Sequence, residues 1–174
     1  WRYATYVWND DETEAVLAPE RGISRGMVIR GNVRHAIPSR SDCTSCHEAG
    51  PARILGFNTL QLSDDRDPNA PHAEPVPAGG MTLGALVSRG VVRGLPRATG
   101  TATRIAAKTP TERAALGYLY GNCSYCHSSR GELASLKLSF DYPIARPEPE
   151  PPAVRTTVEQ ISTFQPASWQ NAER

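Results

Sequence analysis

The chain has four cysteines, and all of them lie in two copies of one short pattern. One copy runs from Cys43 to His47 and the other from Cys123 to His127, and each reads Cys-x-x-Cys-His. Any fold of this chain must therefore place two thiols and an imidazole within about one turn of backbone, at two separate points.

This pattern favours covalent haem attachment over other uses of paired cysteines. In c-type haem sites, the two thiols add to the vinyl groups of the porphyrin and the adjacent histidine binds the iron. A zinc ribbon would need the second pair about 15–20 residues after the first, and zinc would leave both histidines unexplained. A thioredoxin-like pair needs a βαβ setting and a single motif, whereas disulfides between the pairs stay an open alternative. We expect two haem c groups, held by Cys43, Cys46 and His47 and by Cys123, Cys126 and His127.

The sixth ligand of each iron sets its chemistry. Methionine raises the reduction potential and suits electron transfer, a second histidine lowers it, and an open position admits small molecules. Met81 ends a Pro/Gly-rich loop and is our candidate for the first haem, with His72 in the same loop as its competitor. Met27 lies in an apolar run that favours core packing, and His35 is expected on the surface. Neither methionine nor histidine follows His127, so the second haem has no candidate ligand in its own stretch.

The composition is typical of loops wrapped around an apolar cofactor. The chain has 15 prolines and 14 glycines, and 39% of its residues are hydrophobic, which argues against a continuous helical bundle. A buried porphyrin would provide an apolar centre. The 19 basic and 18 acidic residues nearly cancel, so no charge field favours nucleic acid as a partner.

Hydrophobic patterning predicts three parts. Residues 1–37 form a β-rich segment, residues 38–108 a first haem unit, and residues 109–174 a second haem unit, which we expect to be incomplete. Thr109-Pro110-Thr111-Glu112 predicts a helix start, with a capping threonine and proline at the first helical position. A short helix is predicted after Met81, and Pro38 excludes a helix running into the first motif. The expected fold is mainly α with a small β-rich N-terminal part and two loop-rich, cytochrome-c-like haem units.

Longer stretches around the motifs carry a family likeness. They are WRYATYVWNDDETEAVL, HAIPSRSDCTSCH, ILGFNTLQL and YLYGNCSYCHSSRG, and their order extends over most of residues 1–140. In these stretches the chain resembles a family of bacterial di-haem c-type cytochromes, some of which are the haem part of larger secreted proteins. The resemblance implies haem regions that carry electrons and a continuation with a methionine and a closing helix, from which this sequence departs.

The expected function is electron transfer by an exported di-haem cytochrome with a redox partner protein. Haem is attached to cysteine where exported proteins mature, so we expect a periplasmic or cell-surface location and an export signal lost from a longer precursor. No run reaches the ~20 apolar residues of a membrane helix. The alternatives are a di-haem peroxidase or oxidase with one open-coordinate haem, in which His72 is the only candidate base, and a haem module of a larger redox assembly.

Overall fold

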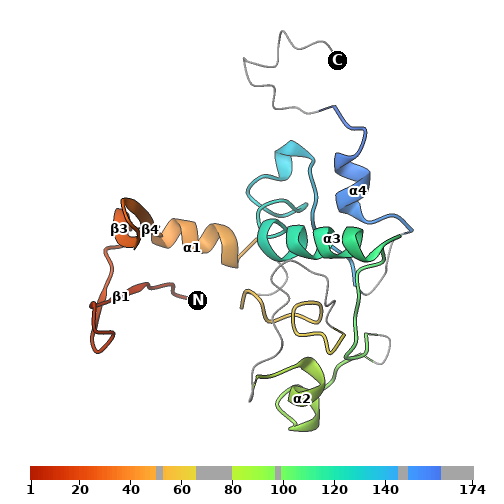
Figure 1. Cartoon of the computed structure of the whole chain (residues 1–174), viewed down its shortest axis with the longest axis horizontal. Helices are drawn as coiled ribbons and strands as arrows, with labels where there is room; N and C mark the ends of the chain where they lie inside the picture. Colours follow the sequence, from red (N-terminus) through yellow and green to blue (C-terminus); the bar gives the residue numbers. More distant parts are fainter. Residues whose placement is uncertain (50–52, 66–79, 97–98, 145–148, 162–174) are drawn as a thin grey trace.

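The computed structural model describes residues 1–49, 53–65, 80–96, 99–144 and 149–161. Its elements in chain order are the strands β1 (Tyr6–Trp8), β2 (Ala15–Leu17), β3 (Ile23–Arg30) and β4 (Val33–Ile37), then the helices α1 (Arg40–His47), α2 (Leu83–Ser88) and α3 (Pro110–Cys123), the 3-10 turn η1 (Ala134–Leu136), and α4 (Pro152–Thr157). Figure 1 shows α1 leading from the N-terminal strands toward α3.

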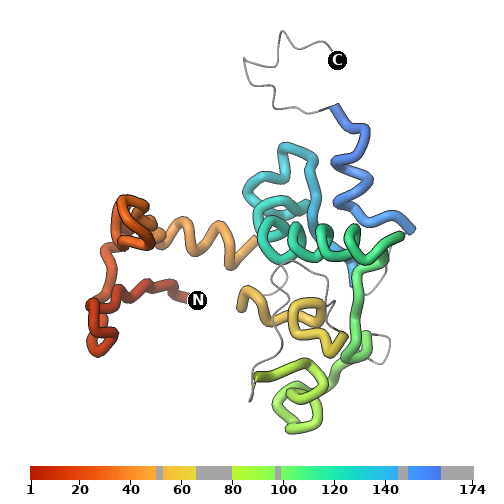
Figure 2. Tube along the Cα trace, in the orientation of Figure 1, coloured from red at the N-terminus to blue at the C-terminus, as the bar shows by residue number. Residues whose placement is uncertain are grey.

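All the described strands lie within residues 1–37, as the patterning predicts. They form two separate antiparallel hairpins, β1–β2 and β3–β4. The second hairpin folds back so closely that a Cβ on Gly22, which has a φ of +72°, would lie 2.4 Å from the carbonyl oxygen of Ile37. Only glycine fits this approach. Both hairpins stand apart from the body that follows α1 (Figure 2).

Helix α1 begins just after Pro38 and contains the whole first motif. Ser39 caps it in a capping box: its hydroxyl accepts from the backbone N–H of Asp42 at 3.1 Å, and its own N–H donates to the Asp42 carboxylate at 2.8 Å. An ion pair between Arg40 and Glu20 ties the helix to the turn between β2 and β3. The expectation that Pro38 excludes a helix running into the first motif is therefore wrong: the helix begins two residues after Pro38, where Ser39 caps it, and runs through the motif.

The predicted start of α3 is confirmed. The hydroxyl of Thr109 accepts from the N–H of Glu112 at 3.1 Å, and Pro110 occupies the first helical position. The carboxylate of Glu112 accepts from the N–H of Lys108 at 2.7 Å, one residue before the cap. The predicted short helix after Met81 is also present, as α2.

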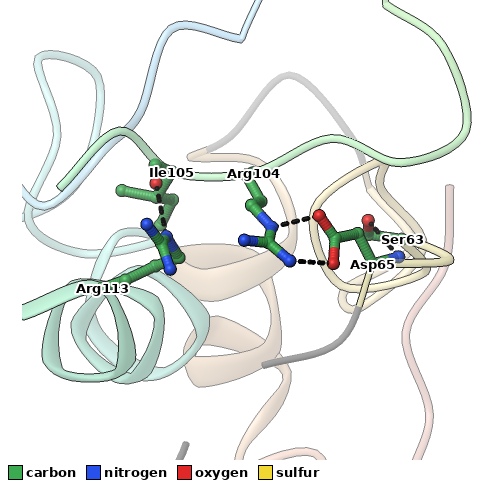
Figure 3. A network of polar contacts seen from close by, with 5 residues as sticks. All are labelled: Ser63, Asp65, Arg104, Ile105 and Arg113. Carbon is green, nitrogen blue, oxygen red and sulfur yellow. Dashed lines mark hydrogen bonds and ion pairs between the residues drawn. The ribbon is translucent and has the colours of Figure 1, made fainter. Parts of the chain in front are cut away.

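The hydrophobic core lies beside α3. Its buried members are Ile105, Leu116, Tyr142 and Ala153. The segment that leads into α3 is held by polar contacts: Arg113 Nε donates to the carbonyl of Ile105 at 3.2 Å, and Arg104 forms an ion pair with Asp65 (Figure 3). These contacts join residues that follow the first motif to the helix that carries the second.

The expectation of a mainly α fold with two cytochrome-c-like units is wrong. Helices account for 27% of the described residues and strands for 14%, which makes this a small mixed α/β fold. Apart from α3, the described helices have six to eight residues, because proline and glycine interrupt the segments between them. No two helices of the described part pack extensively against each other. None of them is long and apolar enough to cross a membrane.

The segment ILGFNTLQL forms turns, where either a short helix or a strand was expected. The side-chain oxygen of Asn58 accepts from the backbone N–H groups of Leu60 and Gln61, at 3.1 and 3.0 Å. A short polar side chain that satisfies two backbone donors competes with regular structure, so the apolar residues of this segment are presented from turns.

Candidate functional site

Both Cys-x-x-Cys-His motifs adopt a single turn of helix. The first forms the last turns of α1, which ends at His47. The second begins at Cys123, the last residue of α3, and the N–H of His127 donates to the carbonyl of Cys123 at 2.9 Å, the spacing of an α-helical turn. All four thiols are free and half-buried. Each motif therefore presents two thiols and an imidazole from one turn, as the sequence predicts.

The two motifs meet through their second cysteines. Burial raises the pKa of the Cys46 thiol, and the nearby thiol of Cys126 raises it further. The nearby Cys43 acts in the same direction. Cys46 and Cys126, which are far apart in sequence, thus lie near enough for one thiol to influence the other, and the spacing of the motifs in sequence did not predict this proximity.

Tyr125, inside the second motif, connects that motif to the turns that follow the first. Its hydroxyl accepts from the N–H of Gly56 and donates to the side-chain oxygen of Gln61, both at 3.1 Å. Asn58 fixes Gln61 in turn, because its side-chain amide donates to the same oxygen. The sequence did not predict these hydrogen bonds of Tyr125, because they depend on where the turns of residues 53–62 lie in the folded chain.

His47 has a defined ring orientation. Its Nδ1 lies 2.6 Å from the backbone carbonyl oxygen of Arg53. A carbonyl can only accept, so Nδ1 carries the proton and Nε2 has a free lone pair, the arrangement found when an imidazole binds a metal.

The first residues of the chain surround His47. The ring of Tyr3 lies 5.2 Å from that of His47, and its hydroxyl donates to the Glu48 carboxylate at 3.1 Å. The guanidinium of Arg53 lies over the ring of Trp1, 5.7 Å from its centroid. The sequence reading did not assign Trp1 or Tyr3 to the site, since no pattern links them to a motif more than one hairpin away.

His127 lies in different surroundings. Its Nδ1 atom is buried and has no hydrogen-bond partner among the described residues. The ring makes an edge contact with Phe140 at 5.3 Å, and the N–H of Phe140 donates to the His127 carbonyl. The chain also turns back tightly here, since a Cβ on Gly131 would lie 2.1 Å from the carbonyl oxygen of Cys126.

The remaining ligand candidates are scattered. Met81 lies just before α2 and is 39% exposed, and no contact found among the described residues joins it to His47. Met27 is 44% exposed on β3, where core packing was expected, because β4 is the one described helix or strand that contacts this strand extensively. Its partner across the hairpin is His35, which is exposed as predicted. His72 lies outside the described residues.

The residues of both motifs fit covalent attachment of haem c. The thiols form no disulfide, the proton of the His47 ring is held on Nδ1 by the Arg53 carbonyl, which leaves Nε2 to bind a metal, and the ring of His127 stands one residue after Cys126 in a half-buried turn. Within the described part, no cluster of three or more Cys, His, Asp or Glu side chains is arranged to hold a metal ion.

Comparison with known proteins adds no assignment. No protein-family model, curated protein or solved structure matches this chain.

Proposed function

We propose that this chain is a c-type di-haem electron-transfer protein, related to the bacterial di-haem cytochromes that it resembles in sequence. Cys43 and Cys46 would hold one haem, with His47 as the axial ligand, and Cys123 and Cys126 the other, with His127 as the axial ligand. The iron of each group would supply one-electron oxidation and reduction. The protein would act in the periplasm or at the cell surface, with a redox partner protein.

The proximity of Cys46 to Cys126, near enough to influence its pKa, carries the proposal. Groups bonded to two nearby sulfur atoms would themselves be neighbours, and electron transfer becomes fast when redox groups lie edge to edge. A pair of independent sites would not need its attachment points close together. The arrangement therefore favours a relay over two unrelated sites.

The small hydrophobic core gives independent support. The buried apolar side chains of the described part are few, and no large side chain is fully buried. The chain is long enough for a larger core, and no two of the described helices pack extensively against each other. Two porphyrins would bury apolar surface that the protein does not bury by itself.

The protein's residues would do three things at these sites. The helical turns set the spacing of the thiols, Arg53 fixes the proton of His47 on Nδ1 through its carbonyl, and Tyr125 holds the two regions together. Each acts by positioning, as expected for an electron carrier that makes and breaks no substrate bonds.

Intact-mass measurement of protein exported from a host with haem-attachment enzymes tests the proposal. We expect the mass of the chain plus two porphyrins, one porphyrin in the double variant C43A/C46A, and two in the control S45A, which changes a residue between the cysteines. A chain without added mass, with four thiols open to alkylation, would refute the function.

The visible spectrum separates the carrier from the enzyme alternative. The absence of any methionine or histidine after His127 keeps that alternative open. Two low-spin haems would support a carrier, whereas a high-spin haem that rapidly binds carbon monoxide would favour a peroxidase, an oxidase or a gas-binding module.

A further inference from the structure

The two histidines of the motifs differ in what their Nδ1 atoms contact. Nδ1 of His47 donates to the Arg53 carbonyl at 2.6 Å, whereas the buried Nδ1 of His127 has no partner in the described part of the chain. A hydrogen bond from Nδ1 makes an imidazole a more basic ligand, and a more basic ligand stabilises ferric iron over ferrous iron. The two iron sites therefore start from different ligand strengths.

The surroundings of the two rings also favour ferric iron more at the His47 site than at the His127 site. His47 is followed by Glu48, an exposed carboxylate, whereas His127 is followed by the buried, neutral Ser128 and contacts the edge of Phe140. The cation of Arg53 lies at the first site as well and opposes the charge of Glu48. With these charges offset, the hydrogen bond to the carbonyl remains the main difference, and an apolar surrounding favours the less charged ferrous state at His127.

Trp1 and Tyr3 hold the first arrangement in place. Tyr3 packs on the His47 ring and is anchored by its hydrogen bond to Glu48, while Trp1 packs on the side chain of Arg53, the residue whose backbone carbonyl accepts the hydrogen bond from Nδ1. The His47 ring and the side chain of Arg53 are thus contacted by the same short segment, which precedes the first hairpin.

We infer that the His47 site has the lower reduction potential of the two, and that Trp1 and Tyr3 are positioning residues that maintain this difference through His47 and Arg53. The inference rests on the proposed function. Electrons entering the protein would then come to rest on the His127 site, which gives the relay a direction.

A potentiometric titration of the di-haem protein, followed in the visible spectrum, tests the inference. We expect two one-electron waves whose midpoint potentials differ by at least about 59 mV, which corresponds to a tenfold preference of the electron for one site. The lower wave should disappear in C43A/C46A, and the upper wave in C123A/C126A. Each wave is assigned to its site by a separate variant, so if one variant fails to fold, the other still identifies which site gives which wave.

The positioning role is tested with Y3A and W1A. Each variant should raise the midpoint potential of the lower wave by at least about 28 mV, which corresponds to a threefold change in the ratio of electron occupancies at 59 mV per tenfold. The midpoint potential of the upper wave should not change. W8A is the matched control: Trp8 is an aromatic residue of β1 that is 57% exposed, and its loss should move neither wave.

Failure of the inference is distinguishable from failure of the proposed function. If intact mass shows two haems but the His127 site has the lower potential, or if Y3A shifts both waves equally, the inference is wrong and the di-haem function stands. If no haem is attached, the function itself is wrong.

Discussion

The hydroxyl of Tyr125 is the clearest single atom on which to test how the two motif regions are joined. The Y125F variant keeps the ring and removes only the oxygen that accepts from Gly56 and donates to Gln61. Any loss of stability can then be attributed to these two hydrogen bonds, since the shape and apolar area of the side chain change little.

The expected cost follows from the contacts. Each hydrogen bond has a net value of about 0.5–1.5 kcal/mol, so two of them give about 1–3 kcal/mol. The N–H of Gly56 is in a half-buried residue, and a donor left without a partner costs more than the average bond. We therefore expect the upper half of this range, with a fall in Tm of about 2–4 °C for each kcal/mol in a chain of this size.

Urea denaturation of the protein, followed by far-ultraviolet circular dichroism, measures this cost. The matched control is Y118F, because Tyr118 lies on α3, ahead of the second motif in the sequence, and its side chain is 52% exposed. Its free energy of unfolding should stay within about 0.5 kcal/mol of the original protein. Equal stability of Y125F and Y118F would refute the view that Tyr125 joins the two regions.

The remaining predictions concern a helix cap, an acid-sensitive carboxylate and a distal iron ligand. T109A removes the cap of α3 and should lower the free energy of unfolding by about 1 kcal/mol, while T111A, at an exposed position of the same helix, should not; an equal loss in both would contradict the capping role. Hydrogen bonds from the side chain and then the backbone of Ser39 hold the pKa of Asp42 below its ordinary value of 3.8. Because this pKa is depressed by folding, the stabilisation is complete above about pH 4 and is lost as the pH falls through the folded value; the stability difference from D42N, measured by urea titration, should therefore be present at about pH 6 and vanish in acid. M81A should abolish the weak sulfur-to-iron band of the oxidised spectrum in the far red, and an unchanged band would exclude Met81 as the ligand of the first haem.

Local signals in the sequence predicted local structure well. The start of α3 was predicted because a capping threonine, a proline and a glutamate act over four successive residues. The cap needs no contact with residues that are distant in sequence. The same logic applies to Ser39 and Asp42, whose capping box was present in the sequence but was not used in the prediction. A serine three residues before an acidic residue would have indicated that the first motif starts its own helix.

The prediction of a mainly α fold was wrong because it extended the helical character of the motifs to whole units. The turns of ILGFNTLQL show why this extension fails. Asn58 satisfies backbone donors that a helix would have used, and hydrophobic periodicity over so short a run does not distinguish a turn from a short helix.

From the sequence alone come the two Cys-x-x-Cys-His motifs, the β-rich character of residues 1–37 and the start of α3, because each depends on residues that are neighbours in the chain. The meeting of Cys46 with Cys126, the acceptor of His47 and the unpartnered nitrogen of His127 came only from the folded structure. Each of these joins groups whose separation depends on how loops close, and loop closure is governed by the sum of many weak contacts that no short pattern records.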